Sequence, residues 1–383
     1  MPPLTTPQTV RSLYVHVPFC QTICGYCDFY SDVLDRGAVG PLVDALIAEL
    51  EHGAAALCLK PDTIFVGGGT PTTLPADALQ RLLSRLARLA ATDVPVEFTC
   101  EANPATVTPE IAGVLVDSGV NRISIGAQSF DTGELKILER IHRPPQVAET
   151  IAVARAAGIR QVNLDLIFGV PGQSLRSWLK NLRAALAFEP DHLSCYGLTY
   201  ERGTPLYEQL RAGQVTRVDE SVEAEMFDAT IDTLAAAGYQ QYEISNFARP
   251  GCECRHNLRY WCNEPSLGIG PSAAGLVNGT RYKNIPDTAE YVRAIAAGRS
   301  PRVEQETLTP DHRARETAML ALRLRAGIDR RRFAARFGND PADLFAEAIA
   351  RNREFGLIEV TPDAVRLTRR GLLLADSVMA EFL

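Results

Sequence analysis

Short apolar runs alternate with segments of helical periodicity over the first two hundred residues. The apolar runs predict strands over residues 12–17, 63–66, 96–100, 122–127, 162–168 and 192–198. Apolar residues at helical spacing predict helices over 40–57, 79–89, 111–116, 147–157 and 178–188. Because alternating strands and helices build parallel sheets, the pattern predicts an α/β fold, a partial (β/α)6 barrel of the TIM type. In such barrels the chemistry collects where the strands end.

The pattern changes after residue 200. A long amphipathic helix is predicted over 220–237 and a short strand over 241–244, while 245–284 lacks periodicity and indicates a functional loop region. Helices over 308–324, 331–337 and 342–355, followed by a hairpin over 356–368, are typical of a winged-helix-like α+β domain. We therefore predict three parts: the barrel over 1–244, the loop region and linker over 245–302, and the C-terminal domain over 303–383.

Composition narrows the functional classes. Hydrophobic residues make up 46% of the 383 residues and charged residues 22%, which is typical of a globular protein. The sequence has no run of eighteen apolar residues, so we predict no membrane span. We also find no basic-then-apolar leader and predict no signal peptide. Nine cysteines, an odd number, favour a reducing cytoplasm and a metal centre over disulfide bonds.

Charge argues against nucleic acid as a partner. The chain has a net charge of −7, and residues 303–383 hold 13 arginines and no lysine against 13 acidic residues. This balance lacks the basic surface of nucleic-acid-binding modules. The winged-helix-like domain is therefore expected to pack or dock against protein.

Three cysteines, Cys20, Cys24 and Cys27, follow the first predicted strand with the spacing C-x3-C-x2-C. Thiolates are the ligands that iron–sulfur clusters and zinc select. Structural zinc needs four ligands; the fourth would have to come from a distant group of candidates, Cys252, Cys254 and His256. A [4Fe–4S] cluster held by three cysteines leaves one iron open to a bidentate small molecule, and the spacing favours this reading.

Polar and glycine residues stand at the ends of the other predicted strands. Gly67–Pro71 follows the second strand, and glycine lets backbone amides approach a ligand closely. Glu101, Gln128 and Asp165 come at the next strand ends, with Arg140 nearby. Together they form polar walls that suit an amino acid, a ribose and an adenine, with arginine pairing to a carboxylate.

The cysteine motif, with an aromatic residue before its third cysteine, resembles the radical S-adenosylmethionine (SAM) superfamily. The resemblance implies that SAM chelates the open iron and that an electron, supplied by a donor, cleaves SAM to a 5′-deoxyadenosyl radical. It also implies a set of SAM-binding positions at the strand ends: Tyr14, Tyr26, Gly68, Gly69, Thr70, Glu101, Gln128, Arg140 and Asp165.

Within that superfamily the chain resembles the coproporphyrinogen dehydrogenase group along nearly its whole length, through four segments: 14–20, 67–71, 124–129 and 163–172. The porphyrinogen-oxidising branch has a longer N-terminal extension and a fourth cysteine, where this chain has Phe29. The heme-chaperone branch carries a His-Asn-x-x-Tyr-Trp motif. This chain matches that motif at four positions: His256, Asn257, Tyr260 and Trp261.

The resemblance implies a heme chaperone that binds heme, a [4Fe–4S] cluster and SAM and passes heme to acceptor apoproteins. Imidazole is a common axial ligand of heme iron, and aromatic rings can cover a porphyrin face. The alternative is an oxygen-independent coproporphyrinogen III dehydrogenase; a nucleic-acid-modifying radical enzyme is more remote.

The remaining cysteines fall into two sets. Three flank the heme motif and can ligate heme, attach it covalently or bind zinc with His256, although the C-x-x-C-H attachment pattern is absent; these are Cys252, Cys254 and Cys262. The other three sit in apolar contexts and are expected to be small buried hydrophobic residues: Cys58, Cys100 and Cys195.

Overall fold

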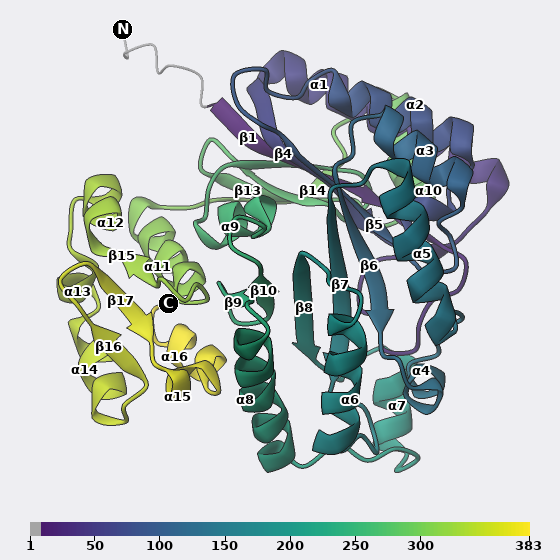
Figure 1. The fold of residues 1–383 in the computed structure, drawn as a ribbon. Coiled ribbons are helices and arrows are strands. Elements are labelled where there is room, and N and C mark those ends of the chain that lie inside the picture. The colour runs from purple at the N-terminus through teal and green to yellow at the C-terminus, as the bar shows by residue number, and fades with distance from the viewer. Residues whose placement is uncertain (1–8) are drawn as a thin grey trace, which may run out of the picture. The chain divides into compact units, whose positions relative to one another are not determined.

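The computed structural model describes residues 9–383 (Figure 1). Contacts divide the chain into two compact units. The barrel unit comprises residues 9–230 and 265–306, and the C-terminal unit comprises residues 231–264 and 307–383. The limits of these units differ from the domain boundaries predicted from the sequence, and those boundaries stay a prediction.

Six parallel strands form the centre of the barrel unit, in the order in which they occur along the chain. They match the six predicted strands and confirm the partial-barrel fold. Their bounds are β1 Thr9–Val17, β4 Cys58–Gly68, β5 Glu97–Ala102, β6 Arg122–Gln128, β7 Gln161–Phe168 and β8 His192–Gly197.

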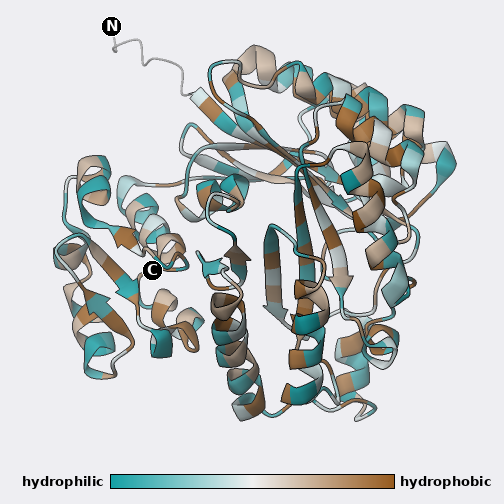
Figure 2. Cartoon of the chain, viewed as in Figure 1, coloured by the Kyte–Doolittle hydropathy of each residue, from teal (hydrophilic) through white to brown (hydrophobic). Residues whose placement is uncertain are grey.

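Helices cover the outer side of this sheet (Figure 1). Figure 2 shows hydrophobic residues along the strands and a mixture of hydrophobic and hydrophilic residues on the helices. The apolar face of α2, for example, buries Leu79, Leu82 and Leu83, and each buried leucine stabilises the fold by about 1.5–3 kcal/mol. The helices are α1 Arg36–Ala56, α2 Ala76–Ala87, α3 Pro109–Asp117, α4 Thr132–Ile137, α5 Pro144–Ala157, α6 Leu175–Leu186 and α7 Pro205–Arg211, with a 3₁₀ turn η1 at Pro71–Thr73.

Four further strands extend the sheet beyond β1, and one further helix lies in the same stretch of the chain. The order continues β1-β11-β12-β13-β14, with β11 parallel to β1 and β12 and β13 antiparallel. The added elements are β11 Ser266–Ile269, β12 Ala274–Val277, β13 Thr280–Asn284, β14 Arg302–Thr307 and α10 Thr288–Ala296.

The expectation of a loop over 245–284 was therefore wrong, because its second half is mostly strand and its first half also holds a strand at Asn246–Ala248 and a helix at Arg255–Trp261. Glycines interrupt the hydrophobic alternation of the second half for a packing reason. A Cβ at Gly268 would lie 2.0 Å from the Ala274 carbonyl oxygen, and one at Gly275 would lie 2.5 Å from the Tyr282 hydroxyl. The missing side chain at Gly268 therefore lets the Ala274 backbone approach, and the one at Gly275 makes room for Tyr282, whose hydroxyl donates to the Gly268 carbonyl at 2.9 Å.

The C-terminal unit holds a three-stranded antiparallel sheet, β15-β17-β16, among short helices, which confirms the winged-helix-like α+β fold. The long helix α8 Glu220–Ala236 spans the division between the units. The unit's other elements are β9 Gln240–Gln241, β10 Asn246–Ala248, α9 Arg255–Trp261, α11 Pro310–Ala321, β15 Ile328–Asp329, α12 Arg330–Phe337, α13 Pro341–Leu344, α14 Ala346–Glu354, β16 Ile358–Val360, β17 Ala364–Leu367, α15 Arg369–Leu372 and α16 Ala375–Ala380.

Across residues 9–383, no helix combines the length and the apolar character that crossing a membrane requires.

Candidate functional site

The three motif cysteines lie on one loop that is closed at its base. The short strand β2 Phe19–Cys20 pairs in parallel with β3 Asp32–Val33, so Cys20 is fixed by backbone bonds. The Cys27 amide donates to the Cys24 carbonyl at 3.1 Å, which makes a tight turn at the far end of the loop. All three thiols are free and half-buried. We call residues 18–33 the cysteine loop.

The glycine-rich segment after β4 packs directly on the cysteine loop. The Gly69 amide donates to Val17 O at 2.8 Å, and the Thr70 amide donates to Phe19 O at 2.7 Å. A Cβ at Gly69 would lie 2.5 Å from the Pro18 carbonyl oxygen, so only glycine fits there. The Thr70 hydroxyl also lies 3.6 Å from Cys20 Sγ. These contacts hold the cysteine loop in place, and the SAM-binding role of Gly68, Gly69 and Thr70 stays a prediction.

The tip of the cysteine loop is anchored from the opposite side. The Leu206 amide of α7 donates to Gly25 O at 2.8 Å. A Cβ at Gly25 would lie 2.8 Å from the Glu139 carboxyl carbon. Tyr26 packs against a cluster of buried residues and burial raises the pKa of its phenol; the cluster is Leu138, Ile167, Val170, Leu198, Tyr200 and Leu206. Tyr26 therefore anchors the loop between its second and third cysteines.

His16 is a site residue that the sequence analysis missed. The Tyr14 hydroxyl lies 3.0 Å from His16 Nδ1, and His16 Nε2 lies 2.9 Å from the Tyr30 carbonyl oxygen. Burial lowers the pKa of His16, which favours the neutral ring. A Cβ at Gly68 would lie 2.7 Å from this ring. His16 thus links β1 to the end of the cysteine loop; its place two residues after Tyr14, on the same strand face, was the available signal.

Two carboxylates interact electrostatically, Glu101 near the end of β5 and Asp165 in the second half of β7. Glu101 Oε2 accepts a hydrogen bond from the Gly68 amide at 3.1 Å. Asp165 accepts from the Ser124 hydroxyl at 3.0 Å and from Asn163 Nδ2 at 2.8 Å. Burial, and then the charge of Asp165, raise the pKa of Glu101 to about 8; burial also raises the pKa of Asp165. A cationic group bound beside this pair would relieve their repulsion.

Arg140 reaches from the segment after α4 to the cysteine loop. Its Nη1 lies 3.4 Å from Cys24 Sγ, and its Nη2 donates to the Gly126 carbonyl at 2.6 Å. Its Nε is buried without a hydrogen-bond partner, and so is Gln128 Oε1. Gln128 itself stands at a bulge in β6 with φ of 60°. Since buried polar atoms normally find partners, this pair indicates a polar ligand at the ends of β5, β6 and β7.

These residues fit SAM and a cluster by their chemistry. The carboxylate pair suits the cationic amino and sulfonium groups of SAM, and Arg140 suits its carboxylate. Burial raises the pKa of the Cys27 thiol to about 11, so a bound cation is needed to hold it as thiolate at neutral pH. Among the described residues, no three His, Cys, Asp or Glu side chains converge on a single metal ion. In a four-iron cluster each thiolate binds its own iron, so that convergence is not required.

The heme-motif residues lie together on one short helix, α9, in the C-terminal unit. His256 is 2% exposed, and its ring centroid lies 5.1 Å from that of Tyr260, one turn further on. The Arg323 guanidinium lies 4.4 Å above the Trp261 ring and forms an ion pair with the buried Glu243 at 3.4 Å. Asn257, Tyr260 and Trp261 are half-buried. His256 must therefore become more exposed before it can ligate heme iron, and its heme role stays a prediction.

The structure shows differences in burial among the remaining cysteines that their sequence context did not predict. Cys100 and Cys195 are buried, as predicted, but Cys58 is half-buried, because it begins β4 at the rim of the sheet. Cys254 is fully buried at the start of α9, and Cys262 is half-buried at its end. In the described chain the flanking cysteines and His256 do not converge on one metal-binding group, and the zinc alternative stays a prediction.

Comparisons with known proteins agree with this geometry. The radical SAM superfamily matches residues 14–185, and the HemN C-terminal domain matches residues 308–374. The solved structure of coproporphyrinogen III oxidase (HemN) from Escherichia coli aligns with a TM-score of 0.86 at 24% identity, covering 99% of this chain and 91% of that one. At that identity the likeness shows the fold alone.

Curated relatives match along the whole chain. The heme chaperone HemW of Bacillus subtilis is 36% identical over 98% of this chain and 99% of its own length. HemW of Mycobacterium tuberculosis is 38% identical, covering 97% of this chain and 94% of its own. HemW of Escherichia coli is 36% identical, covering 97% and 98%. With this identity over 97–98% of its length, a radical SAM barrel and a HemN-type C-terminal domain, the chain belongs to the HemW family.

Proposed function

We propose that this protein is a heme chaperone that binds heme and delivers it to acceptor apoproteins. The observation that carries the proposal is helix α9 of the C-terminal unit, which brings His256, Asn257, Tyr260 and Trp261 together on one short segment. The relatives named heme chaperone HemW support it. Phe29 adds to it, because this side chain is 73% exposed where the porphyrinogen-oxidising branch carries a fourth cysteine.

The proposed cofactors are a [4Fe–4S] cluster and SAM. Cys20, Cys24 and Cys27 would hold the cluster, which when bound can supply one electron to SAM. Glu101 and Asp165 would accept the cationic end of SAM. The other predicted SAM positions would complete the pocket: Tyr14, Tyr26, Gly68, Gly69, Thr70, Gln128 and Arg140. An electron-donor protein is the further partner we propose, and nucleic acid is not.

SAM binding should depend on the two carboxylates. We expect Asp165→Asn and Glu101→Gln each to weaken SAM binding about tenfold, because each removes a charge-assisted contact to a cationic group. Calorimetry on the anaerobically reconstituted protein measures this. Asp93→Asn is the matched control, since Asp93 is 56% exposed and forms a surface ion pair with Arg11 at 3.1 Å. Unchanged affinity in both site variants, with the cluster intact, would place SAM elsewhere.

The function itself is tested by transfer. Reconstituted protein loaded with heme is mixed with an apo-hemoprotein, and holo-acceptor is followed by its absorption spectrum. We expect transfer faster than from free heme, and no decarboxylation of coproporphyrinogen in a parallel assay. Turnover of coproporphyrinogen at ordinary enzymatic rates, without heme transfer, would replace the chaperone by the dehydrogenase.

A further inference from the structure

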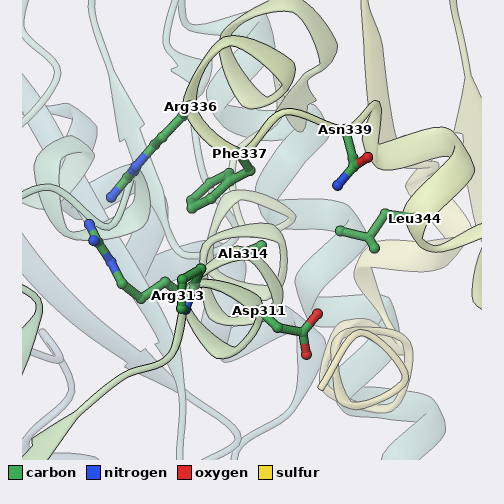
Figure 3. Close-up of a pocket in the computed structure, with 8 residues that line it drawn as sticks. Asp311, Arg313, Ala314, Arg336, Phe337, Asn339 and Leu344 are labelled. Carbon is green, nitrogen blue, oxygen red and sulfur yellow. The ribbon is translucent and has the colours of Figure 1, made fainter.

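A pocket in the C-terminal unit takes no part in the sites described so far (Figure 3). Its volume is about 330 Å³. This lies near the lower end of the range for small-molecule sites, so it suits a side arm or an edge of a larger ligand. Helices α11 and α12 and the segment after them supply its lining: Pro310, Asp311, Arg313, Ala314, Arg336, Phe337, Asn339 and Leu344.

Two arginines give one end of this pocket a positive charge. The guanidinium groups of Arg313 and Arg336 converge there (Figure 3). Arg313 Nε is buried without a hydrogen-bond partner, and within residues 9–383 Arg313 forms no ion pair. The acidic lining residue, Asp311, is already paired with Arg315 at 2.9 Å. The charge of Arg313 therefore has no ion-pair partner among the described residues and suits an anion, whereas Glu264 partly offsets the charge of Arg336.

Four of the other six lining residues are apolar. Phe337 and Ala314 lie next to the arginine side chains, and Leu344 lies on the other side of the pocket (Figure 3). The Arg336 guanidinium lies 5.0 Å from the Phe337 ring centroid, which fixes its plane. A guanidinium pair next to apolar walls suits a carboxylate carried on an apolar body, because arginine can bind a carboxylate through two parallel hydrogen bonds.

Arg336 connects this pocket to the heme motif. Its Nη1 donates to the Cys262 carbonyl at 3.0 Å and its Nη2 to the Asn263 carbonyl at 2.8 Å. Cys262 directly follows Trp261 at the end of α9. At 1.5 Å per residue, His256 and Cys262 are about 9 Å apart along the helix. The pocket therefore adjoins the end of the helix that carries the candidate heme ligand.

We propose that Arg313 and Arg336 bind a heme propionate while the macrocycle lies against α9. This inference rests on the proposed function. The two propionates are the anionic groups of heme, and each joins a carboxylate to an apolar ring edge, which is the chemistry that the pocket offers. Arg313 supplies a positive charge that has no ion-pair partner among the described residues. Arg336 places the propionate site next to the end of α9.

The test compares heme with its dimethyl ester, in which both propionates are neutral. We expect the wild-type protein to bind heme on the order of tenfold more tightly than the ester, and Arg313→Gln to lose that preference while keeping its affinity for the ester. Arg313→Lys keeps the charge and should retain part of the preference. Arg331→Gln is the matched control, because Arg331 is on the same helix as Arg336 and its side chain is 88% exposed.

The outcomes separate this inference from the proposed function. Equal affinity of the wild type for heme and ester, or an unchanged preference in Arg313→Gln, overturns the propionate site but leaves the chaperone intact. Failure of the wild type to bind either compound overturns the proposed function. If instead a peptide with a free C-terminal carboxylate binds the wild type and not Arg313→Gln, while the heme preference is unchanged, the pocket serves a protein carboxylate and the propionate site is wrong.

Discussion

Replacing Cys24 with serine is expected to remove the iron–sulfur cluster almost completely. Cys20, Cys24 and Cys27 are the three thiols of the cysteine loop, so the loss of one leaves two protein ligands for a cluster that already has an open iron. Arg140 Nη1, 3.4 Å from Cys24 Sγ, would also lose the sulfur that accepts its hydrogen bond. The fold should persist, because the loop is held by β2–β3 pairing and by Gly69 rather than by the thiol.

The measurement is iron and acid-labile sulfide per chain after anaerobic reconstitution. The wild type should approach four of each, which is the composition of the cluster, and the variant should hold almost none. Cys58→Ser is the matched control, because Cys58 is also half-buried and free but begins β4 outside the cysteine loop. Near-stoichiometric zinc in the wild type, or full iron content in Cys24→Ser, would contradict the cluster assignment.

Replacing His256 with alanine is expected to abolish axial ligation of heme by this chain. His256 supplies the imidazole of the motif, and the axial ligand sets the electronic state of heme iron. The Soret band should shift, and heme affinity should fall by a factor of ten or more, since a metal–ligand bond is lost. Trp261→Ala should weaken binding through lost apolar contact, by roughly 1–3 kcal/mol, without changing the ligand class.

The burial of His256 makes this experiment informative. At 2% exposure the ring could equally serve the packing of α9, and then alanine would lower thermal stability and leave the heme spectrum unchanged. His312→Ala is the control, because His312 is an exposed histidine of the same unit and would take part only in nonspecific binding. Iron–sulfur content should be the same in all variants, since the motif and the cysteine loop belong to different units.

Local sequence determined the six parallel strands and the position of the metal-binding loop. Each central strand is a short apolar run. Such a run can be recognised in the sequence because a central strand is buried on both faces, so that its successive residues are apolar. The C-x3-C-x2-C spacing places Cys20, Cys24 and Cys27 on one loop without any long-range information. The heme motif is likewise contiguous, and it occupies one helical segment, α9.

Tertiary structure decided what depends on contacts between distant segments. The strands β11 and β12 could not be predicted from alternation, because Gly268 is required by the backbone of Ala274 and Gly275 by the ring of Tyr282. The need for glycine at 69 comes from the Pro18 carbonyl, 51 positions earlier. Arg313 and Arg336 meet only because α11 packs near α12, and His256 is buried by the packing of its helix. The spacing of residues in the sequence determines which side chains can serve as ligands. Steric fit and burial depend on contacts between distant segments, and they determine whether those side chains can reach a ligand.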